Sequence, residues 1–104
     1  MTSAGLASDT GFRENAEASR FELPFPTGTV TADFLREPGL FVVTYVYAPP
    51  ALRGTGAADR LMRGVAAQAR AESRNILALC GYARRWLGAH SAHADLLVRG
   101  RNPG

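Results

Sequence analysis

Gly54 and Gly56 separate two segments of opposite pattern, and this boundary constrains the fold more than any other feature of the chain. Before it, Leu40–Tyr47 is aromatic and β-branched almost throughout, which predicts a strand. Its near-continuous apolar run predicts burial on both faces of a sheet. After the glycines, apolar residues recur at the spacing of one helical stripe. That stripe consists of Ala58, Leu61, Met62, Val65, Ala66 and Ala69.

Shorter patterns on either side complete the order β-β-β-α-β-α. Residues 20–23 alternate polar with apolar, and 29–35 are rich in β-branched residues, so each predicts a strand. Residues 75–79 predict a further strand, 82–89 a second helix, and 93–97 a helical turn. An antiparallel meander that leads into a right-handed β-α-β crossover is an α+β fold, a mixed α/β sandwich.

The length and composition indicate one small domain. The chain has 104 residues, 46% of them hydrophobic, which suffices for a modest core. We expect this domain to span 20–98, between flexible tails at 1–19 and 99–104. No segment approaches the roughly 20 apolar residues that cross a bilayer, and the N-terminus lacks the apolar block of a secretory signal. A single cysteine excludes an internal disulfide, so a cytoplasmic protein without membrane partners is expected.

Charge is distributed unevenly along the chain. All basic side chains are arginines, and the sequence contains no lysine. Through Leu52 there are three arginines and six acids, a net charge of −3; from Arg53 onward there are nine arginines and three acids, a net charge of +6. The C-terminal half therefore suits an anionic ligand such as coenzyme A, a nucleic acid or a phosphorylated partner, although a solvated arginine-rich surface gives the same composition.

The glycine loop itself indicates a phosphate site. Unpaired N–H groups and the positive end of the helix dipole meet at a helix N-terminus, and glycines allow close approach of a ligand. A P-loop requires a lysine, which is absent, and a dinucleotide fingerprint requires a third glycine where Asp59 stands. Arg53, Gly56 and Ala58 instead fit an Arg/Gln-x-x-Gly-x-Gly/Ala pattern. A tight strand-to-helix turn without a ligand would use the same glycines.

With this loop, the sequence resembles the GNAT N-acetyltransferases, and most closely a subgroup of very short members. The resemblance extends over about residues 20–98. The motifs that carry it are Val42-Val43-Thr44-Tyr45, Pro49-Pro50-Ala51-Leu52-Arg53-Gly54-Thr55-Gly56-Ala57-Ala58, Leu77-Ala78-Leu79-Cys80-Gly81-Tyr82-Ala83 and His90-Ser91-Ala92-His93-Ala94-Asp95-Leu96-Leu97.

The resemblance implies an abbreviated GNAT fold and a backbone-lined pocket over Arg53–Ala58 for the pyrophosphate of acetyl-CoA. It implies, as the activity, acyl transfer from the CoA thioester to an amine. The acceptor, a small amine or a protein tail, is not indicated. The chain departs from the family where a histidine and an acid often stand on the central strand, since Tyr45 and Tyr47 occupy those positions. The general base is therefore left unassigned.

Within this framework, we expect Cys80, Tyr45 and His90 to take part in catalysis. The residues expected to bind the cofactor are Tyr47, Ala48, Arg53, Gly54, Thr55, Gly56, Ala57, Ala58, Cys80, Tyr82 and Trp86. Each has a structural alternative: tyrosines are ordinary in strands, a cysteine is often a core residue, and a histidine after a helix commonly bonds its last carbonyls. Tyr82 and Trp86, four apart, would equally form part of a core.

Two other functions remain open. A CoA-binding module without catalysis fits the missing histidine and acid. An arginine-rich nucleic-acid-binding protein fits the charge, but the basic half lacks an aromatic stacking surface, which disfavours it. His90 and His93 have no further cysteine or acid cluster that would complete a metal site, so no metal is expected. The chain is expected to be a monomer or a homodimer.

Overall fold

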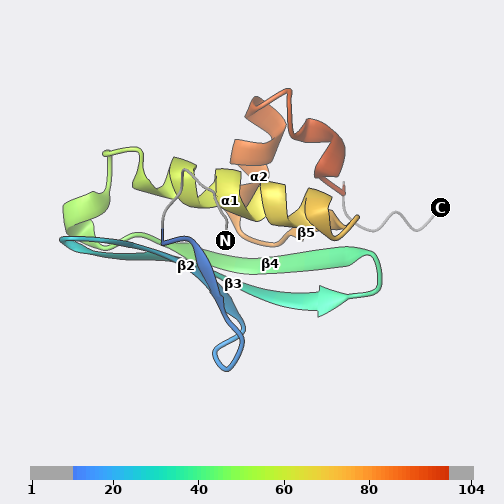
Figure 1. The fold of residues 1–104 in the computed structure, drawn as a ribbon. Coiled ribbons are helices and arrows are strands. Elements are labelled where there is room, and N and C mark those ends of the chain that lie inside the picture. Colours follow the sequence, from blue (N-terminus) through green and yellow to red (C-terminus); the bar gives the residue numbers. More distant parts are fainter. Residues whose placement is uncertain (1–10, 99–104) are drawn as a thin grey trace.

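The computed structural model describes residues 11–98 as a five-stranded sheet with both α-helices on one of its faces (Figure 1). The strands lie side by side in chain order; the first four are antiparallel, and β4 and β5 are parallel. The strands are β1 Arg13–Asn15, β2 Arg20–Phe25, β3 Gly28–Glu37, β4 Leu40–Tyr47 and β5 Asn75–Ala78. The α-helices are α1 Ala57–Ala71 and α2 Gly81–Ala89, and the 3-10 helices are Pro50–Leu52 and Ala94–Leu96. The α+β class and the order of the predicted elements are thus confirmed.

One correction concerns the N-terminal segment. Residues 11–19, which the sequence assigns to a flexible tail, contain β1, and β1 extends the sheet beside β2. The sequence gives no signal for it because β1 is short and polar. Its stability comes from distant partners: Arg13 Nε lies 2.9 Å from Glu22 Oε1, and the ring of Phe12 packs on Gly64 of α1. The predicted tails at 1–10 and 99–104 lie outside the described residues.

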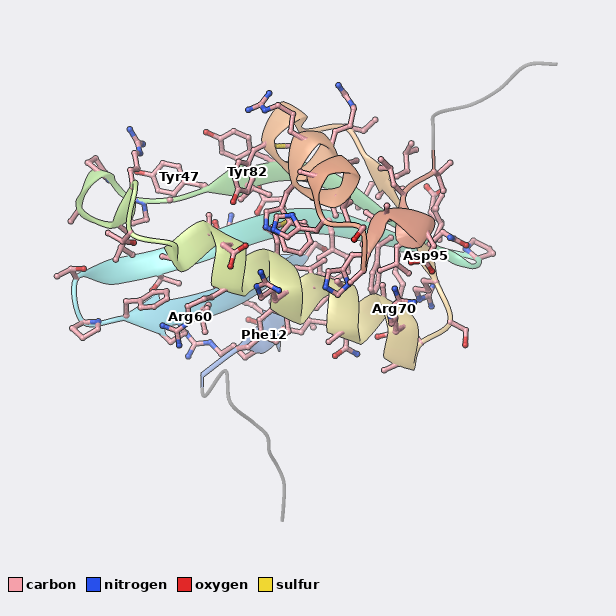
Figure 2. All side chains as sticks on the ribbon, turned by 90° about the horizontal axis from the view of Figure 1, so that it is seen from above. Phe12, Tyr47, Arg60, Arg70, Tyr82 and Asp95 are labelled. Carbon is pink, nitrogen blue, oxygen red and sulfur yellow. The ribbon has the colours of Figure 1, made fainter. Side chains whose placement is uncertain are left out.

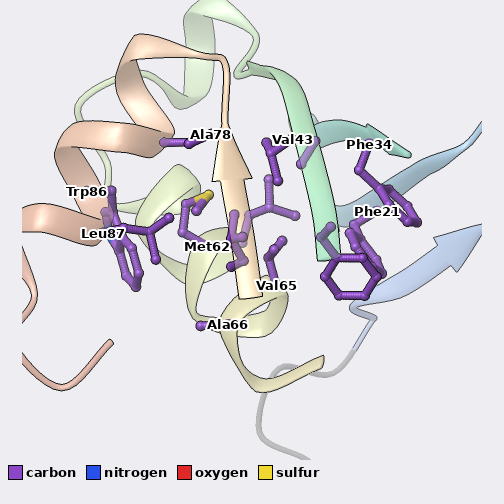
Figure 3. Close-up of a cluster of buried hydrophobic side chains, with 14 of the residues drawn as sticks. Phe21, Phe34, Val43, Met62, Val65, Ala66, Ala78, Trp86 and Leu87 are labelled. Atoms are coloured by element: carbon purple, nitrogen blue, oxygen red, sulfur yellow. The ribbon is translucent and has the colours of Figure 1, made fainter. Parts of the chain in front are cut away.

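The core lies between the sheet and the helices (Figure 3). On α1 it includes Leu61, Met62, Val65, Ala66 and Ala69, which are the predicted stripe without its first member. Ala57 is buried in place of Ala58, which is half-buried, because the helix begins at Ala57 and its first turn faces the sheet. The small side chains on this stripe let α1 lie close on the strands.

β4 differs from the prediction in its second half. Phe41, Val42 and Val43 are buried, as expected for both faces, but Thr44 and Tyr45 are exposed. The reason is that β5 pairs only with Leu40–Val43 and then ends. The pairing with β3 shifts register at the same point: Asp33 pairs with Tyr45 and Phe34 with Val43, so Thr44 is an extra residue in β4. Beyond it β4 continues without a neighbour on one side, and the candidate site opens there.

Candidate functional site

The chain leaves β4 through Pro49 and a 3-10 helix and enters α1 through a four-residue loop, Arg53 to Gly56. Gly54 and Gly56 have φ of 78° and 89°, a conformation that residues with a Cβ rarely adopt. A Cβ built on either glycine would meet no protein atom within 4 Å. Positive φ therefore requires the glycines, and open space lies above both.

The loop turns the hydroxyl of Thr55 toward its own backbone and leaves several backbone amides without a hydrogen bond. Thr55 Oγ1 donates to the carbonyl of Leu52 at 2.5 Å and accepts from the amide of Ala57 at 3.2 Å. Within residues 11–98, the amides of Gly54, Gly56, Ala58 and Asp59 have no hydrogen-bond partner. Two of these belong to the first turn of α1, where the helix dipole adds positive potential. Such an arrangement of donors can bind an anion with several oxygens.

These amides border a pocket of about 430 Å³. The pocket lies between the unpaired half of β4, the loop, the first turn of α1 and the start of α2. Its lining consists of Val46, Ala48, Leu52, Arg53, Gly54, Gly56, Ala58, Asp59 and Tyr82. Most of these side chains are apolar or absent, so the polar groups of the pocket are mainly backbone amides, Arg53, Asp59 and Tyr82.

The structure brings six of the eleven residues expected to bind a cofactor into this lining: Ala48, Arg53, Gly54, Gly56, Ala58 and Tyr82. Thr55 and Ala57 shape the loop from within. Tyr47 stands outside the lining, and the guanidinium carbon of Arg53 lies 5.8 Å from the centre of its ring. Arg53 Nε also donates to the carbonyl of Ala48 at 2.8 Å, which fixes the arginine beside the loop.

Trp86 lies away from the pocket lining, in the core. Its Nε1 donates to Asp59 Oδ1 at 2.8 Å, and its ring stacks on the ring of His90 at 4.0 Å. Trp86 is therefore part of the core, which is the alternative to cofactor binding that the sequence left open. The bond from Trp86 ties α2 to the first turn of α1, and therefore holds two walls of the pocket together.

Asp59 is the centre of this connection. Burial alone would raise the pKa of Asp59, but hydrogen bonds from Trp86 and Arg63, with the charges of Arg63 and His90, lower it. Both carboxylate oxygens are engaged, since Arg63 Nε lies 2.9 Å from Oδ2. Asp59 is therefore held as an anion that positions side chains.

His90 follows α2 and faces back toward the helix. Its Nδ1 lies 2.7 Å from the carbonyl oxygen of Trp86, and its Nε2 lies 3.5 Å from Asp59 Oδ1. This matches the helix-end alternative that the sequence left open. His93 also stacks on Trp86, at 5.4 Å, and its Nδ1 is buried without a partner. Burial, with the charges of Arg70 and Arg63, lowers the pKa of His93.

Tyr82 is the one hydroxyl group in the lining. Burial raises its pKa, and the neighbouring Asp59 carboxylate adds to the effect, so the phenol stays protonated at neutral pH. Cys80 is the N-cap residue of α2, is half-buried against the core, and is outside the lining. Tyr47 and Tyr82 project along the same edge of the molecule (Figure 2).

Tyr45 lies on the opposite face of the sheet from the pocket. Because Thr44 is an extra residue in β4, Val46 lies opposite buried Ala32 and faces the helices, whereas Tyr45 and Tyr47 point away from them. The two tyrosine rings stack, with their centroids 6.4 Å apart. The structure thus separates the three residues expected to be catalytic: Tyr45 on the outer sheet face, Cys80 at the cap of α2 and His90 at its end.

Val46, Leu52 and Asp59 line the pocket although the sequence analysis did not select them. Strict alternation from Val43 would place Val46 on the other face of the sheet. Val46 reaches the lining only because Thr44 is an extra residue in β4, and no sequence pattern indicates that bulge. No sequence signal connects Asp59 with Trp86, because 27 residues separate them. In residues 11–98 no group of three or more His, Cys, Asp and Glu side chains is arranged to hold a metal ion. The same residues include no helix that is both long and apolar enough to span a membrane.

The fold is an α+β protein with a pocket between the unpaired half of β4 and the N-terminus of α1. The sequence pattern of one family, described as GCN5-related N-acetyl-transferase, matches residues 20–96. The chain belongs to this family, as the resemblance of its motifs indicated, and its fold is an abbreviated form of the GNAT fold. No curated protein matches the sequence.

Proposed function

We propose that this protein binds acetyl-CoA in the pocket beside the glycine loop and transfers the acetyl group to an amine. The observation that carries the proposal is the set of unbonded amides of Gly54, Gly56, Ala58 and Asp59 around open space. They present several donors within one turn, as a pyrophosphate requires. Membership of an acetyltransferase family makes acetyl-CoA the ligand of choice for such a loop.

The pocket residues suit a thioester ligand beyond its pyrophosphate. Val46, Ala48 and Leu52 offer an apolar wall along the unpaired half of β4, which suits a narrow aliphatic arm. Arg53 adds a fixed positive charge at the mouth, because Ala48 and Tyr47 hold its guanidinium. The unpaired edge of β4 offers backbone N–H groups to a carbonyl oxygen that gains charge during transfer.

Transfer requires a new C–N bond, cleavage of the C–S bond, loss of a proton from the amine and gain of a proton by the thiolate. Tyr82 supplies that last proton in this proposal, because its raised pKa keeps it protonated and it lines the pocket. Tyr82 is thus both a contact for acetyl-CoA and a general acid. The amine loses its proton to solvent, since both oxygens of Asp59 are engaged by Trp86 and Arg63.

Cys80 offers a second route, in which its thiol takes the acetyl group first. Because the cysteine is outside the pocket lining, we favour direct transfer. Intact-mass measurement after mixing with acetyl-CoA distinguishes the two. An acetyl adduct on Cys80 that an amine then removes would overturn direct transfer.

A CoA-binding module without catalysis is the second candidate, favoured by the absence of a free carboxylate or imidazole in the pocket lining. One experiment separates the functions. Thermal unfolding is measured with acetyl-CoA, CoA and a DNA oligonucleotide, and release of the CoA thiol is followed with small amines and with lysine peptides. A ligand at 100 times its Kd adds about 2.7 kcal/mol of stability.

We expect a thermal shift with both CoA species together with thiol release that requires an acceptor. A shift without turnover on any acceptor would leave the binding module. A shift with the oligonucleotide alone would replace both by nucleic-acid binding. We also propose that the protein is cytoplasmic, as the sequence leads us to expect.

A further inference from the structure

All large hydrophobic side chains that are well exposed in residues 11–98 lie on the face of the sheet that carries no helix. They are Leu35, Tyr45, Tyr47 and Leu79, with 52%, 55%, 38% and 57% of their surface exposed. Leu35 pairs with Val42, and Val42 with Leu77, two positions before Leu79. Tyr45 and Tyr47 lie opposite Asp33 and Thr31, which alternate onto the same face of β3 as Leu35. Figure 1 shows α1 and α2 together on the opposite side of the sheet. We call this surface the outer face.

The composition of the outer face is unusual for a face turned to water. Antiparallel sheets commonly carry polar residues on an open face, and parallel strands are usually covered on both faces. Here the parallel pair β4–β5 presents apolar residues on both sides: Phe41 and Ile76 toward the helices, Val42 and Leu77 outward. The outer face over β3 to β5 therefore has the residues of a covered surface.

Two pairs of charged residues at the border of the outer face are matched within one chain. Arg20 Nε lies 2.9 Å from Asp33 Oδ1, and Arg13 Nε lies 2.9 Å from Glu22 Oε1. Each pair is neutral in sum, so two copies of this face meet without like-charge repulsion. A strongly charged partner would find no complementary field here.

The area of the outer face matches what a dimer of this size needs. A large side chain has roughly 150–250 Å² of surface. With about half of that surface exposed on each of the four, the exposed apolar area is on the order of 400 Å². A standard interface buries about 800 Å² per partner, of which about 56–58% is non-polar, or roughly 450 Å². The exposed apolar surface is thus close to one side of such an interface.

We propose that a second copy of this chain packs against the outer face, sheet to sheet, about a twofold axis. Such a contact is isologous, because the same surface serves on both subunits. Two sheets pack face to face about 10 Å apart and interdigitate their side chains, which would cover Leu35, Tyr45 and Leu79. The glycine loop, on the helix side, stays open.

Sedimentation equilibrium of the full chain tests this, up to about 100 µM protein, where an interface with a micromolar Kd is saturated. We expect the wild type to sediment with the mass of a dimer, twice 11.1 kDa. Leu35→Asp and Leu79→Asp, each checked for native circular dichroism, should sediment at 11.1 kDa. Ala67→Asp, on the exposed side of α1, should remain dimeric.

A wild type of 11.1 kDa at the highest concentration would overturn the proposal and leave the outer face to an acceptor polypeptide or another protein. A dimer that both leucine variants leave intact would overturn it as well, because the contact would then lie elsewhere. Since both leucines are exposed in one chain, neither replacement removes a core contact.

Discussion

Gly56 has positive φ and stands immediately before α1, whereas Gly39 has positive φ in the distant β3–β4 turn. Neither would bring a Cβ within 4 Å of protein atoms. Alanine at either position should therefore cost about 1–2 kcal/mol of unfolding free energy through backbone strain alone. Denaturant unfolding should give similar losses for Gly56→Ala and Gly39→Ala.

The two variants should differ in ligand binding. The methyl group of Gly56→Ala enters the open space above the loop, so we expect the Kd for CoA to rise at least about tenfold, or 1.4 kcal/mol. Gly39→Ala should bind CoA as the wild type does. Equal affinity in both variants would mean that the loop glycines serve the turn alone.

The prediction about proton transfer concerns Tyr82. Tyr82→Phe should lower kcat about 100-fold, which is typical of losing a general acid, and change the Kd for CoA little. In the wild type, kcat should fall as the pH rises through the pKa of Tyr82, which lies above the ordinary value because of burial and the charge of Asp59. Steady-state kinetics across pH checks both.

Tyr45→Phe provides the comparison. Should it lose activity while Tyr82→Phe retains it, the acid would be the tyrosine on the outer face. Binding measured by calorimetry separates either effect from a loss of affinity.

At the scale of elements, α1 packs closely on the N-terminal segment at Gly64. A Cβ built on Gly64 would lie 2.5 Å from Cδ1 of Phe12, so a glycine is needed where the ring lies on the helix. Elsewhere in a helix, Gly→Ala gains about 1 kcal/mol. We expect Gly64→Ala to gain that full amount only in a Phe12→Ala background, where the ring is absent.

A double-mutant cycle measured by urea unfolding gives the coupling between the two positions. Gly88→Ala, on α2 with nothing within 4 Å of its built Cβ, is the control and should gain about 1 kcal/mol in either background. Additive effects of Gly64→Ala and Phe12→Ala would show that β1 and α1 do not depend on this contact.

The central elements were predictable because each has a local pattern. The aromatic, β-branched run of β4 and the stripe of α1 are readable over eight or more residues, and both are present. β1 was not predictable, since its stability depends on Glu22 and on Gly64, far along the chain. The exposure of Tyr45 was missed for a related reason: where β5 ends relative to β4 depends on the crossover.

At the scale of the whole molecule, Arg36 of β3 joins distant parts through two carboxylates. Its guanidinium nitrogens bond Glu14 of β1 and Glu72 after α1 at 2.8–3.0 Å. Hydrogen bonds from Arg36, Gln68 and Arg74 hold the pKa of Glu72 well below its usual range, and Arg36 likewise lowers that of Glu14.

These lowered pKa values predict how stability depends on acid. A carboxylate whose pKa is lower in the folded state stabilises fully above its unfolded pKa, about 4.3, and the contribution is lost as the pH falls below that value. Glu72→Gln should therefore be less stable than the wild type at pH 7, and the difference should shrink toward pH 3. Chemical unfolding at several pH values measures it.

Glu17→Gln, in the exposed β1–β2 turn, is the matched control. Its unfolding free energy should follow that of the wild type at every pH. A constant difference between Glu72→Gln and the wild type from pH 7 to pH 3 would contradict the assigned role of the network.

The candidate site was predictable to the extent that it is local. The loop from Arg53 to Ala58 follows from consecutive residues, and most of it lies at the pocket. Other features depend on how α2 packs against α1. These are the hydrogen bond between Asp59 and Trp86 and the positions of Trp86 and His90 outside the pocket lining. A contact between two side chains 27 residues apart, on different helices, has no signature in a single sequence.

The central claim is that the amides of the glycine loop bind CoA, and an NMR titration of ¹⁵N-labelled protein tests it most directly. Glycine amides report on the backbone itself, and Gly39 and Gly88 provide internal references away from the loop. We predict that CoA shifts the amide signals of Gly54, Gly56 and Ala58 most strongly and leaves those of Gly39 and Gly88 nearly unchanged. An unchanged spectrum at saturating CoA, or shifts confined to other parts of the chain, would contradict the account.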